Sequence, residues 1–528
     1  MATSILPETA PFTEEQRAWL NGFFAGIYGM DEPPVAAMEH AMATVEEIGT
    51  SPVEEDEDYP WHDAALEIEE RMVLAEGQPM ERRMMAAMAQ LDCGACGYEC
   101  KSYSEAIAQG NETNLTLCVP GGRETSRLLK TLVKEIGVQP TAPKSIGASS
   151  GQSASAKTWS RANPYPASLL ESRKLNGIGS AKDTRHVAID LGDSGLEYHV
   201  GDALGVYPSN CDDLVSEIVS ALGVKADHRV DTERGLSTLA LVLRDECCLK
   251  APTEELLDAL CSATGDEGEQ AKLKQLLDDD SELDGCDVLD VLKMFPSAVL
   301  DPQTLVASLG TLNPRLYSIA SSLKANPGQV HLTVGKVTWG SAGRLRKGAA
   351  STMLAERVGV GGQVRVFVHK SHGFTVPANP AAPMMMVGPG TGIAPFMAFL
   401  QERHATQATG KNWLFFGDQC QATDYLYQAE LAAYQASGLL SRLDTAFSRD
   451  QERKVYVQDK MREQAAEVWS WLEAGGYFFV CGDASRMAVD VEKTLLEIIQ
   501  SEGGMDAVAA KAYLKRLSDD KRYSRDVY

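Results

Sequence analysis

An apolar run that leads into a glycine-rich turn constrains the fold of this 528-residue chain most strongly. Met384–Val387 has the length and composition of a buried strand, Gly388-Pro389-Gly390-Thr391-Gly392 follows it, and Ile393–Phe396 begins a helix. Glycines let the backbone approach a pyrophosphate, and the free N–H groups at a helix start favour an anion. A tight strand–helix turn also requires glycine without any ligand, so the turn alone leaves both interpretations open.

The strand and helix patterns around this turn predict a multidomain α/β and β protein. Short apolar strands at 384–387, 413–417 and 477–481 alternate with helical patterns, which is typical of a doubly wound parallel sheet. Strand patterns at 185–207, 314–320, 329–339 and 362–369 predict an antiparallel barrel. The helical, acidic stretch between about 209 and 305 is predicted to be an insertion in that barrel.

The N-terminal third has a different composition. Residues 13–90 are mostly helical in pattern, with Thr13 as a helix N-cap, and the stretch Met84–Met88 suits a packed helix. The small and polar residues at 139–160 predict a linker. Residues 1–90 hold 19 acidic and 4 basic side chains, and 54–58 is the densest acidic run. This run fits a solvated surface, or one that attracts a basic partner protein.

Charge and hydropathy exclude several classes of partner. The net charge is -25, and such a surface repels nucleic acid and anionic lipid. No apolar run approaches the roughly 18 residues of a membrane span. The first residues also lack the pattern of a signal peptide. A cytoplasmic protein with no nucleic-acid or membrane partner is therefore expected.

Four of the eleven cysteines lie close together, as Cys93-x2-Cys96-x3-Cys100-x17-Cys118. Four thiolates separated by glycines suit a [4Fe-4S] cluster. Structural zinc also uses four cysteines, although its paired Cys-x2-Cys pattern fits this spacing less well. Free thiols are the third reading, and disulfides are not expected in a reducing compartment.

Two segments in the predicted barrel are typical of a flavin site. Arg315 and Ser318 would hold a flavin phosphate and the N5 edge of the ring, while Tyr317 packs on the ring. The small residues Gly348–Ser351 precede a helix, where backbone N–H groups can hold a pyrophosphate. Each segment is equally compatible with a strand or a helix start that binds nothing, so the prediction depends on their order.

Two further segments suit a nicotinamide nucleotide. Ser448-Arg449 and Lys454-Val455-Tyr456-Val457-Gln458 place hydroxyl and basic side chains after another strand, as a 2′-phosphate requires. A solvated basic loop is the alternative. The segment Lys521–Tyr528 ends in an aromatic ring that could cover a flavin and move aside for nicotinamide.

Residues from about 160 to 528 resemble the flavoprotein subunit family of NADPH–sulfite reductase, within the wider class of ferredoxin-NADP⁺-reductase-like and diflavin reductases. The resemblance rests on Arg185-His186 and on the segments 189–195, 201–206, 314–322, 388–395, 481–488 and 523–528.

The resemblance implies a role for each matching position. The implied FAD contacts are Arg315, Leu316, Tyr317, Ser318, Thr333, Val334, Gly335, Trp339, Gly348, Ala349, Ala350, Ser351 and Tyr528. The implied NADPH contacts are Gly390, Thr391, Ser448, Arg449, Lys454, Val455, Tyr456, Val457, Gln458 and Asp490. The implied hydride-transfer group is Ser318, Cys481, Asp526 and Tyr528.

The N-terminal region departs from this family. A flavodoxin-like FMN domain is not expected, since no flavodoxin phosphate loop precedes residue 160. Residues 93–122 instead resemble the small cysteine-rich [4Fe-4S] domain of some electron-transfer complexes. In that domain the second gap is usually four residues, and in this chain it is three. The predicted ligands are Cys93, Cys96, Cys100 and Cys118.

The predicted domains are an iron–sulfur-type helical domain (1–138), a linker (139–160), an FAD-binding barrel with its insertion (161–380) and an NADP-binding domain (381–528). The predicted function is an NADPH-dependent reductase that passes electrons through FAD and the cluster to a partner redox enzyme. The resemblance implies a sulfite reductase haemoprotein as that partner. A nitrite or nitrate reductase, or another acceptor, is the alternative, with the four cysteines forming a structural zinc docking module.

Overall fold

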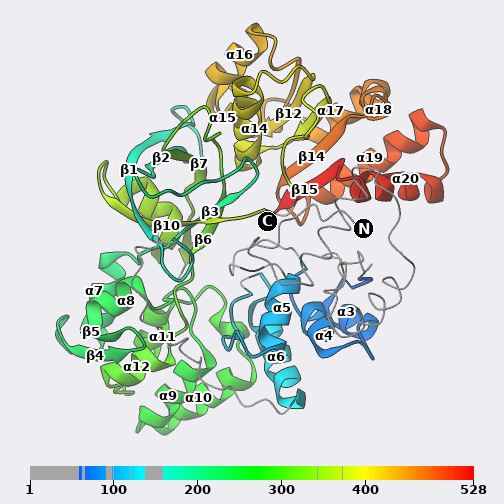
Figure 1. The fold of residues 1–528 in the computed structure, drawn as a ribbon. Helices are drawn as coiled ribbons and strands as arrows, with labels where there is room; N and C mark the ends of the chain where they lie inside the picture. The colour runs from blue at the N-terminus through cyan, green and yellow to red at the C-terminus, as the bar shows by residue number, and fades with distance from the viewer. Residues whose placement is uncertain are drawn as a thin grey trace, which may run out of the picture. The chain divides into compact units, whose positions relative to one another are not determined.

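The computed structural model describes residues 59–61, 66–90, 98, 100–118, 120–136, 159–341, 343–371 and 373–528. All described helices and strands lie in one compact unit, residues 60–528 (Figure 1). The predicted helix start at Thr13, the acidic run at 54–58, the cysteines Cys93 and Cys96, and the linker up to residue 158 lie outside the described residues. No helix in the described part is long and apolar enough to cross a membrane.

In the described residues before the predicted linker there are four helices: α3 (Ile68–Leu74), α4 (Met80–Ala86), α5 (Cys100–Ala108) and α6 (Gly122–Ile136). The prediction that the Met84–Met88 stretch packs in a core is confirmed, because Met84, Met85 and Met88 are at most 2% exposed. Thr125 of α6 donates a hydrogen bond to the Ala87 carbonyl at 2.7 Å. α4 and α6 are therefore packed together.

Six antiparallel strands form the next layer: β1 (Tyr165–Lys174), β2 (Thr184–Asp190), β3 (Ala203–Val206), β6 (Arg315–Ser318), β7 (Gln329–Gly335) and β10 (Gln363–His369). Their order is β6-β3-β10-β1-β2-β7. A further antiparallel bridge pairs Ile319 with Leu332 and joins the two outer strands, which closes the sheet on itself. Leu169, Val187, Leu204 and Val366 belong to the core that the sheet encloses. The predicted antiparallel sheet is confirmed.

The segment between β3 and β6 has a core of its own. Its helices are α7 (Asp212–Ala221), α8 (Leu239–Asp245), α9 (Glu254–Ala263), α10 (Glu267–Asp278), α11 (Val288–Met294) and α12 (Pro302–Ser308), with a 3₁₀ turn η1 (Ser281–Leu283). Leucine and valine side chains of these helices form one buried cluster. The sequence pattern missed the small hairpin β4 (Arg229–Thr232) and β5 (Gly235–Thr238) within this helical segment.

A second hairpin lies outside the six-stranded sheet. Its strands are β8 (Thr338–Ser341) and β9 (Arg344–Lys347), and it is followed by α13 (Ala349–Thr352) and a π-helical turn η2 (Met353–Arg357). In β8 and β9 the partly covered residues alternate with exposed ones, so one face of the hairpin is covered and the other is open.

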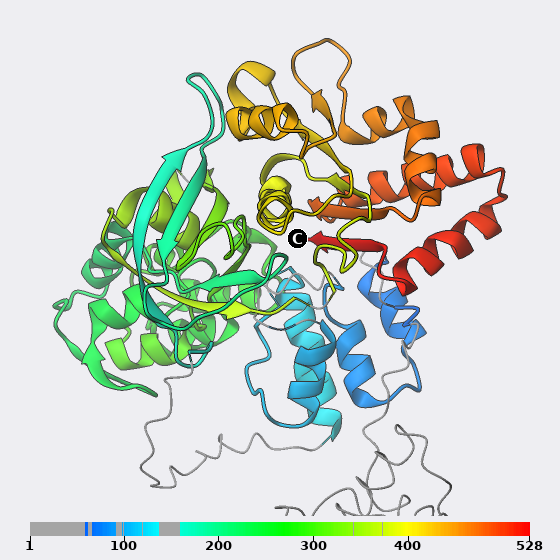
Figure 2. The same ribbon diagram turned by 45° about the horizontal axis from the view of Figure 1, so that its top comes forward.

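The C-terminal part is a parallel sheet with helices on both faces (Figures 1 and 2). Its strands are β11 (Met384–Val387), β12 (Asn412–Asp418), β13 (Arg442–Phe447), β14 (Tyr477–Gly482) and β15 (Tyr523–Val527), in the order β13-β12-β11-β14-β15. The remaining elements are η3 (Gly390–Ile393), α14 (Ala394–Ala405), α15 (Gln421–Asp424), α16 (Gln428–Ala436), α17 (Val457–Glu463), α18 (Ala465–Glu473), α19 (Met487–Gly503) and α20 (Ala507–Asp519).

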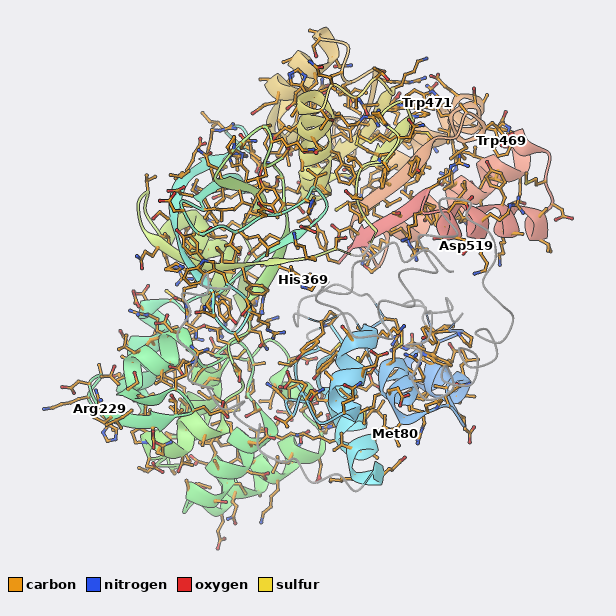
Figure 3. All side chains as sticks on the ribbon, in the orientation of Figure 1. Met80, Arg229, His369, Trp469, Trp471 and Asp519 are labelled. Carbon is orange, nitrogen blue, oxygen red and sulfur yellow. The ribbon has the colours of Figure 1, made fainter. Side chains whose placement is uncertain are left out.

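The inner strands of this sheet contribute side chains to two cores, because successive side chains point to opposite faces. Met384 and Met386 pack with α14 and α16, whereas Met385 and Val387 pack with α17 to α20. Trp471, which projects from α18, packs against Trp413 with ring centroids 5.2 Å apart (Figure 3). The predicted parallel sheet is confirmed.

One of these cores also includes residues from the antiparallel part. Phe374, which follows β10, packs against Phe479 of β14 with ring centroids 5.6 Å apart and is 5% exposed. Val200 belongs to the same cluster. The next residue, Gly201, has a φ of +98°, and a Cβ there would lie 1.6 Å from the Phe374 carbonyl oxygen. Only glycine permits this approach, so the two parts share a close-packed core.

Polar contacts complete this interface. The Tyr427 hydroxyl lies 2.7 Å from the Thr333 hydroxyl of β7 and 3.1 Å from Nδ1 of His186 in β2. The His186 ring meets the ring of His331 edge to face, with centroids 4.9 Å apart. Burial lowers the pKa of both histidines to about 4. Both rings are therefore neutral at physiological pH.

The histidine pair predicts an acid-dependent loss of stability. Their folded-state pKa of about 4 lies below the ordinary value of about 6.5. The stabilisation is complete above pH 6.5 and is lost as pH falls from 6.5 toward 4, since unfolding then takes up protons. Each histidine contributes up to about 1.4 kcal/mol per pH unit in that window. We expect the thermal midpoint to fall accordingly.

The measurement is the thermal midpoint between pH 7 and 4.5 for three proteins. The double variant His186→Gln/His331→Gln should show a shallower decline than the wild type. The variant His228→Gln is the control, because His228 is an exposed histidine of the insertion. The charged groups nearest His186 are Arg173 and Glu430, and they remain in all three proteins. Equal declines in all three would contradict the assignment.

Candidate functional site

The pairing of β15 with β14 brings three predicted site residues together. In this parallel register Asp526 lies opposite Cys481, and Val527 lies opposite Gly482. Oδ2 of Asp526 accepts a hydrogen bond from Ser318 Oγ at 2.6 Å and lies 3.7 Å from Cys481 Sγ. Ser318 ends β6 of the antiparallel sheet, so this contact also joins the two sheets. Nothing in the local pattern had predicted β15 as a strand.

Tyr528 is held beside the glycine turn. Its backbone N–H donates to the Gly482 carbonyl at 3.0 Å, and its carbonyl accepts from Ala484 N–H at 3.2 Å. Its hydroxyl lies 2.9 Å from the Thr391 hydroxyl. The side chain nevertheless remains 48% exposed. The ring is thus anchored by its backbone and by one hydroxyl contact, while much of its surface is open.

A cavity of about 390 Å³ lies between the two sheets, and it has room for a flat ring system. Tyr317, Ser318, Thr333, His369, Asp526 and Tyr528 are among its lining residues; His369 is labelled in Figure 3. Cys481 is fully buried and is absent from the lining. Of the predicted hydride-transfer group, three members therefore face the cavity and Cys481 supports them from behind.

Burial tunes the ionisable groups of this cavity. It raises the pKa of the Asp526 carboxyl, an effect that the hydrogen bond from Ser318 opposes. It also raises the pKa of the Cys481 thiol well above its ordinary value, and the neighbouring Asp526 adds to that shift. Cys481 is consequently a neutral thiol at physiological pH, so its contribution is packing and a weak S–H donor.

A second cavity, of about 690 Å³, continues from the first. Leu316, Tyr317, Gly335 and Val337 line both of them. The predicted residues Arg315, Trp339 and Gly348–Ser351 line only the second, together with residues of the helical insertion. Val337 and Leu345, two apolar residues of its wall, are 53% and 65% exposed. The two cavities thus adjoin and form one continuous site.

Val334 is the one predicted FAD contact that does not reach either cavity. Its side chain is 1% exposed and lies in the core of the antiparallel sheet, because neighbours on a strand point to opposite faces. Thr333 and Gly335, on either side of it, do line the smaller cavity. Only the backbone of Val334 is available to a ligand.

A wide cleft of about 1310 Å³ adjoins the glycine turn. Its lining includes the predicted NADPH contacts Gly390, Thr391, Ser448, Tyr456, Val457, Gln458 and Asp490, and also Tyr528. Gln458 donates to Asp490 at 3.1 Å. Arg449, Lys454 and Val455 are not lining residues: Arg449 and Lys454 are exposed, and Val455 packs against a core.

Sequence reasoning missed several charged residues of this cleft, among them Lys182 and Asp418. Lys182, from the loop between β1 and β2, forms an ion pair with Asp418 at the end of β12. Both residues line the cleft. They are 236 positions apart in the sequence, and neither stands in a motif, so no local signal could have paired them.

The glycine turn is constrained by packing alone. A Cβ at Gly392 would lie 2.1 Å from the Cys481 carbonyl oxygen, and a Cβ at Gly388 would lie 2.4 Å from the Gly392 carbonyl oxygen. Gly390 has a φ of +58°. The interpretation that tight strand–helix geometry itself requires glycine, with or without a ligand, is thus correct. The same absence of side chains opens the cleft floor to a nucleotide.

Two of the four predicted metal ligands lie in the described part of the chain. Cys100, at the start of α5, and Cys118 are both buried. They lie close to the buried guanidinium of Arg71, where their negative forms oppose the lowering of its pKa by burial. A cation beside two cysteines suits the negative charge of a thiolate-ligated metal or iron–sulfur site. Among the described residues no complete group of metal ligands is assembled.

Family comparisons agree with this geometry. Residues 157–353 match a model described as "FAD binding domain", and residues 386–493 match one described as "Oxidoreductase NAD-binding domain". The chain carries an FAD-binding domain and an oxidoreductase NAD-binding domain. Residues 88–120 match a third model, described as "Putative Fe-S cluster", which covers all four clustered cysteines.

Similar full-length proteins share most of this chain. The "Sulfite reductase [NADPH] flavoprotein alpha-component" of Serratia proteamaculans is 48% identical over 374 residues, which is 70% of this chain and 62% of that protein. The proteins of the same name from Klebsiella pneumoniae and an Escherichia coli O9:H4 strain are each 46% identical over 376 residues, with the same coverage. The chain thus spans about 62% of the length of these relatives.

The two connected cavities fit FAD in shape and in chemistry. The smaller one is lined by Tyr317, Ser318, Thr333 and Tyr528, whose aromatic and hydroxyl groups suit a flavin ring. The larger one offers an arginine, small residues and an aromatic side chain for the nucleotide half. The individual contacts stay predictions, but the chemistry of these residues suits the cofactor that the matching domain binds.

Substitution at the glycine turn should be costly. In Gly392→Ala the new methyl group would have to displace the Cys481 backbone, so we expect a loss of about 1–3 kcal/mol in the free energy of unfolding. The check is the thermal midpoint beside that of Gly359→Ala, because a Cβ at Gly359 meets nothing within 4 Å. Equal midpoints for the two variants would show that the close approach is not rigid.

Proposed function

We propose that this chain is an NADPH-dependent flavoprotein reductase that delivers electrons to a partner redox enzyme. The observation that carries the proposal is the contact of Ser318 and Asp526 in the cavity between the two sheets, with Tyr528 at its side. It lies at the junction of an FAD-sized site and the nucleotide cleft, and Tyr528 and Thr391 line both. The names of the relatives support the same activity.

Bound FAD would accept a hydride from NADPH and release the two electrons separately. Hydride transfer needs close alignment of two rings rather than a strong acid or base. Ser318 orients the ring edge by a hydrogen bond, and it shares its hydroxyl with Asp526. The Asp526 carboxylate stabilises the positive charge that develops on nicotinamide. Tyr528 covers the ring slot until nicotinamide replaces it.

Preference for the 2′-phosphate is assigned to the loop after β13 and the start of α17. Ser448 and Tyr456 line the cleft, and the exposed cations Arg449 and Lys454 are near enough in sequence to swing toward it. Gln458 and Asp490 complete this part of the site. Charged and hydroxyl groups of this kind suit a phosphate rather than a ribose hydroxyl.

The cysteines Cys93, Cys96, Cys100 and Cys118 are proposed to hold a [4Fe-4S] cluster that takes the place of FMN. The cluster domain would extend over residues 1–138, the FAD-binding part over 161–380 and the NADP-binding part over 381–528. Ion pairs support contact between the first two parts: Arg127 of α6 reaches Glu254 of α9 at 3.1 Å, and Lys130 reaches Glu255 at 3.2 Å. The acceptor proposed is a sulfite reductase haemoprotein, in the cytoplasm.

Replacing Tyr528 tests the nucleotide site. We expect Tyr528→Ala to retain FAD and to lose much of its preference for NADPH over NADH, since no ring then displaces weakly held nicotinamide. The measurement is kcat/KM for both nucleotides with ferricyanide as acceptor. Tyr528→Phe is the matched control, because it keeps the ring and loses only the hydroxyl contact with Thr391. Discrimination that stays unchanged in Tyr528→Ala would contradict a covering ring.

Metal analysis tests the relay. We expect about four irons and four sulfides per chain after anaerobic purification, the content of one cube. Cys118→Ser should lose most of this iron and the electron transfer to a haemoprotein, while NADPH-dependent ferricyanide reduction persists. Cys261→Ser, outside the cluster motif, is the control. About one zinc per chain without sulfide would favour the zinc docking module, and the relay would have to lie on another protein.

A further inference from the structure

The β8–β9 hairpin forms one wall of the larger cavity but has few means of holding itself in place. It is a separate two-stranded sheet, and an isolated hairpin of this size is marginally stable in water. Trp339 and Arg346 are direct cross-strand partners, as are Ser341 and Arg344. These four side chains share one face of the hairpin, because residues two apart on a strand point the same way.

This face is fastened to the helical insertion by two carboxylates, of which Asp287 is buried and Asp290 is partly buried. Asp287 accepts a hydrogen bond from Arg344 and forms an ion pair with Arg346 at 2.9 Å. Asp290 accepts from Arg346 and lies 3.3 Å from Arg344. Ser341 Oγ adds a hydrogen bond to the Gly285 carbonyl at 3.2 Å. The Asp287 and Arg346 side chains are each 6% exposed. Every pairing of the two acids with the two arginines is thus made.

Hydrogen bonds at the start of helix α11 also hold the two carboxylates in place. Asp287 is the N-cap of α11, and its Oδ1 accepts from Asp290 N–H at 3.0 Å. Oδ2 of Asp290 accepts in return from Asp287 N–H at 3.0 Å. This capping box fixes both side chains to the helix start. Helix α11 is anchored by Val288, Leu289 and Val291, which are fully buried in the core of the insertion.

This ion cluster orients the hairpin more than it stabilises the fold. Removing two acids and two arginines from water costs about as much as their mutual attraction returns, so a buried ion cluster adds little net stability. Its paired, forked hydrogen bonds permit only one relative placement of the groups. The consequence is a hairpin whose covered face, including Trp339, has a defined position at the cavity wall.

We propose that Asp287 and Asp290 are positioning residues for the adenosine half of FAD. They hold the two arginines, and through them they hold the hairpin so that Trp339 faces the ligand. This inference rests on the proposed function, since it requires FAD in the two cavities. The smaller cavity takes the ring, so the larger one, where Trp339 lies, takes the nucleotide half, including the adenosine that FMN lacks.

The test is the binding of FAD and of FMN to protein freed of flavin, followed by quenching of flavin fluorescence. Asp287→Asn removes the charge and keeps a good N-cap residue. We expect it to weaken FAD binding about tenfold, the loss of one aromatic contact, and to leave FMN binding unchanged within about twofold. Asp284→Asn is the control, because Asp284 is an exposed acid of the same loop.

A double-variant cycle shows whether the acid acts through Trp339. Trp339→Leu alone should weaken FAD binding, and adding Asp287→Asn to it should change the dissociation constant little further. Independent, multiplying effects would overturn the proposal, as would equal weakening of FAD and FMN or an unchanged affinity in Asp287→Asn. Arg344→Gln, on the hairpin side, should repeat the result of Asp287→Asn if that variant fails to fold.

The same titration separates this inference from the function on which it rests. If the wild-type protein binds neither FAD nor FMN, both the proposed reductase function and the positioning role are contradicted. Wild-type protein that binds FAD tightly, with Asp287→Asn behaving the same, would overturn only the positioning role.

Discussion

The pairing of β15 with β14 is the constraint on which the site depends. A one-residue shift of this register would turn Asp526 to the opposite face of the sheet, away from Ser318 and Cys481. The same pairing sets Tyr528 against Gly482 and Ala484, and from there its hydroxyl reaches Thr391. Five backbone pairs thus place a carboxylate, a thiol and an aromatic ring in one step.

The polar and charged contacts between elements mainly determine how those elements are oriented relative to one another. The Asp287–Arg346 cluster, the Lys182–Asp418 pair and the hydrogen bond from Ser318 to Asp526 each join elements that belong to different sheets or cores. A buried pair such as Asp287–Arg346 is expensive to desolvate and adds little to the free energy of folding. The apolar clusters supply the stability, and the polar contacts determine how their surfaces meet around the cavities.

Local sequence signals predicted the parts of the fold that are locally determined. The strand Met384–Val387, the turn after it and Arg315–Ser318 stand out because composition and spacing identify them without knowledge of their neighbours. Strands β13 and β15 carry polar residues, since they border the sheet, so no apolar run revealed them. The contact between Lys182 and Asp418 forms only because the fold brings distant segments together, so no local sequence pattern predicts it. Arg449 and Lys454 were predicted from their charge, but charge does not say which way a loop side chain points.

The core shared through Phe374 has a consequence for how the proposed reductase would work. Two bodies that interlock through aromatic rings cannot hinge apart without opening a cavity in both, and such openings are rare and slow. The distance between the flavin and nicotinamide rings would then be set by the fixed arrangement of the two parts rather than by closure of a lid. What must move is a single half-exposed side chain, and rotations of that kind take place in picoseconds to nanoseconds. In the proposed reductase the two ring sites would thus be preassembled, and only the Tyr528 side chain would have to rotate to admit the nucleotide.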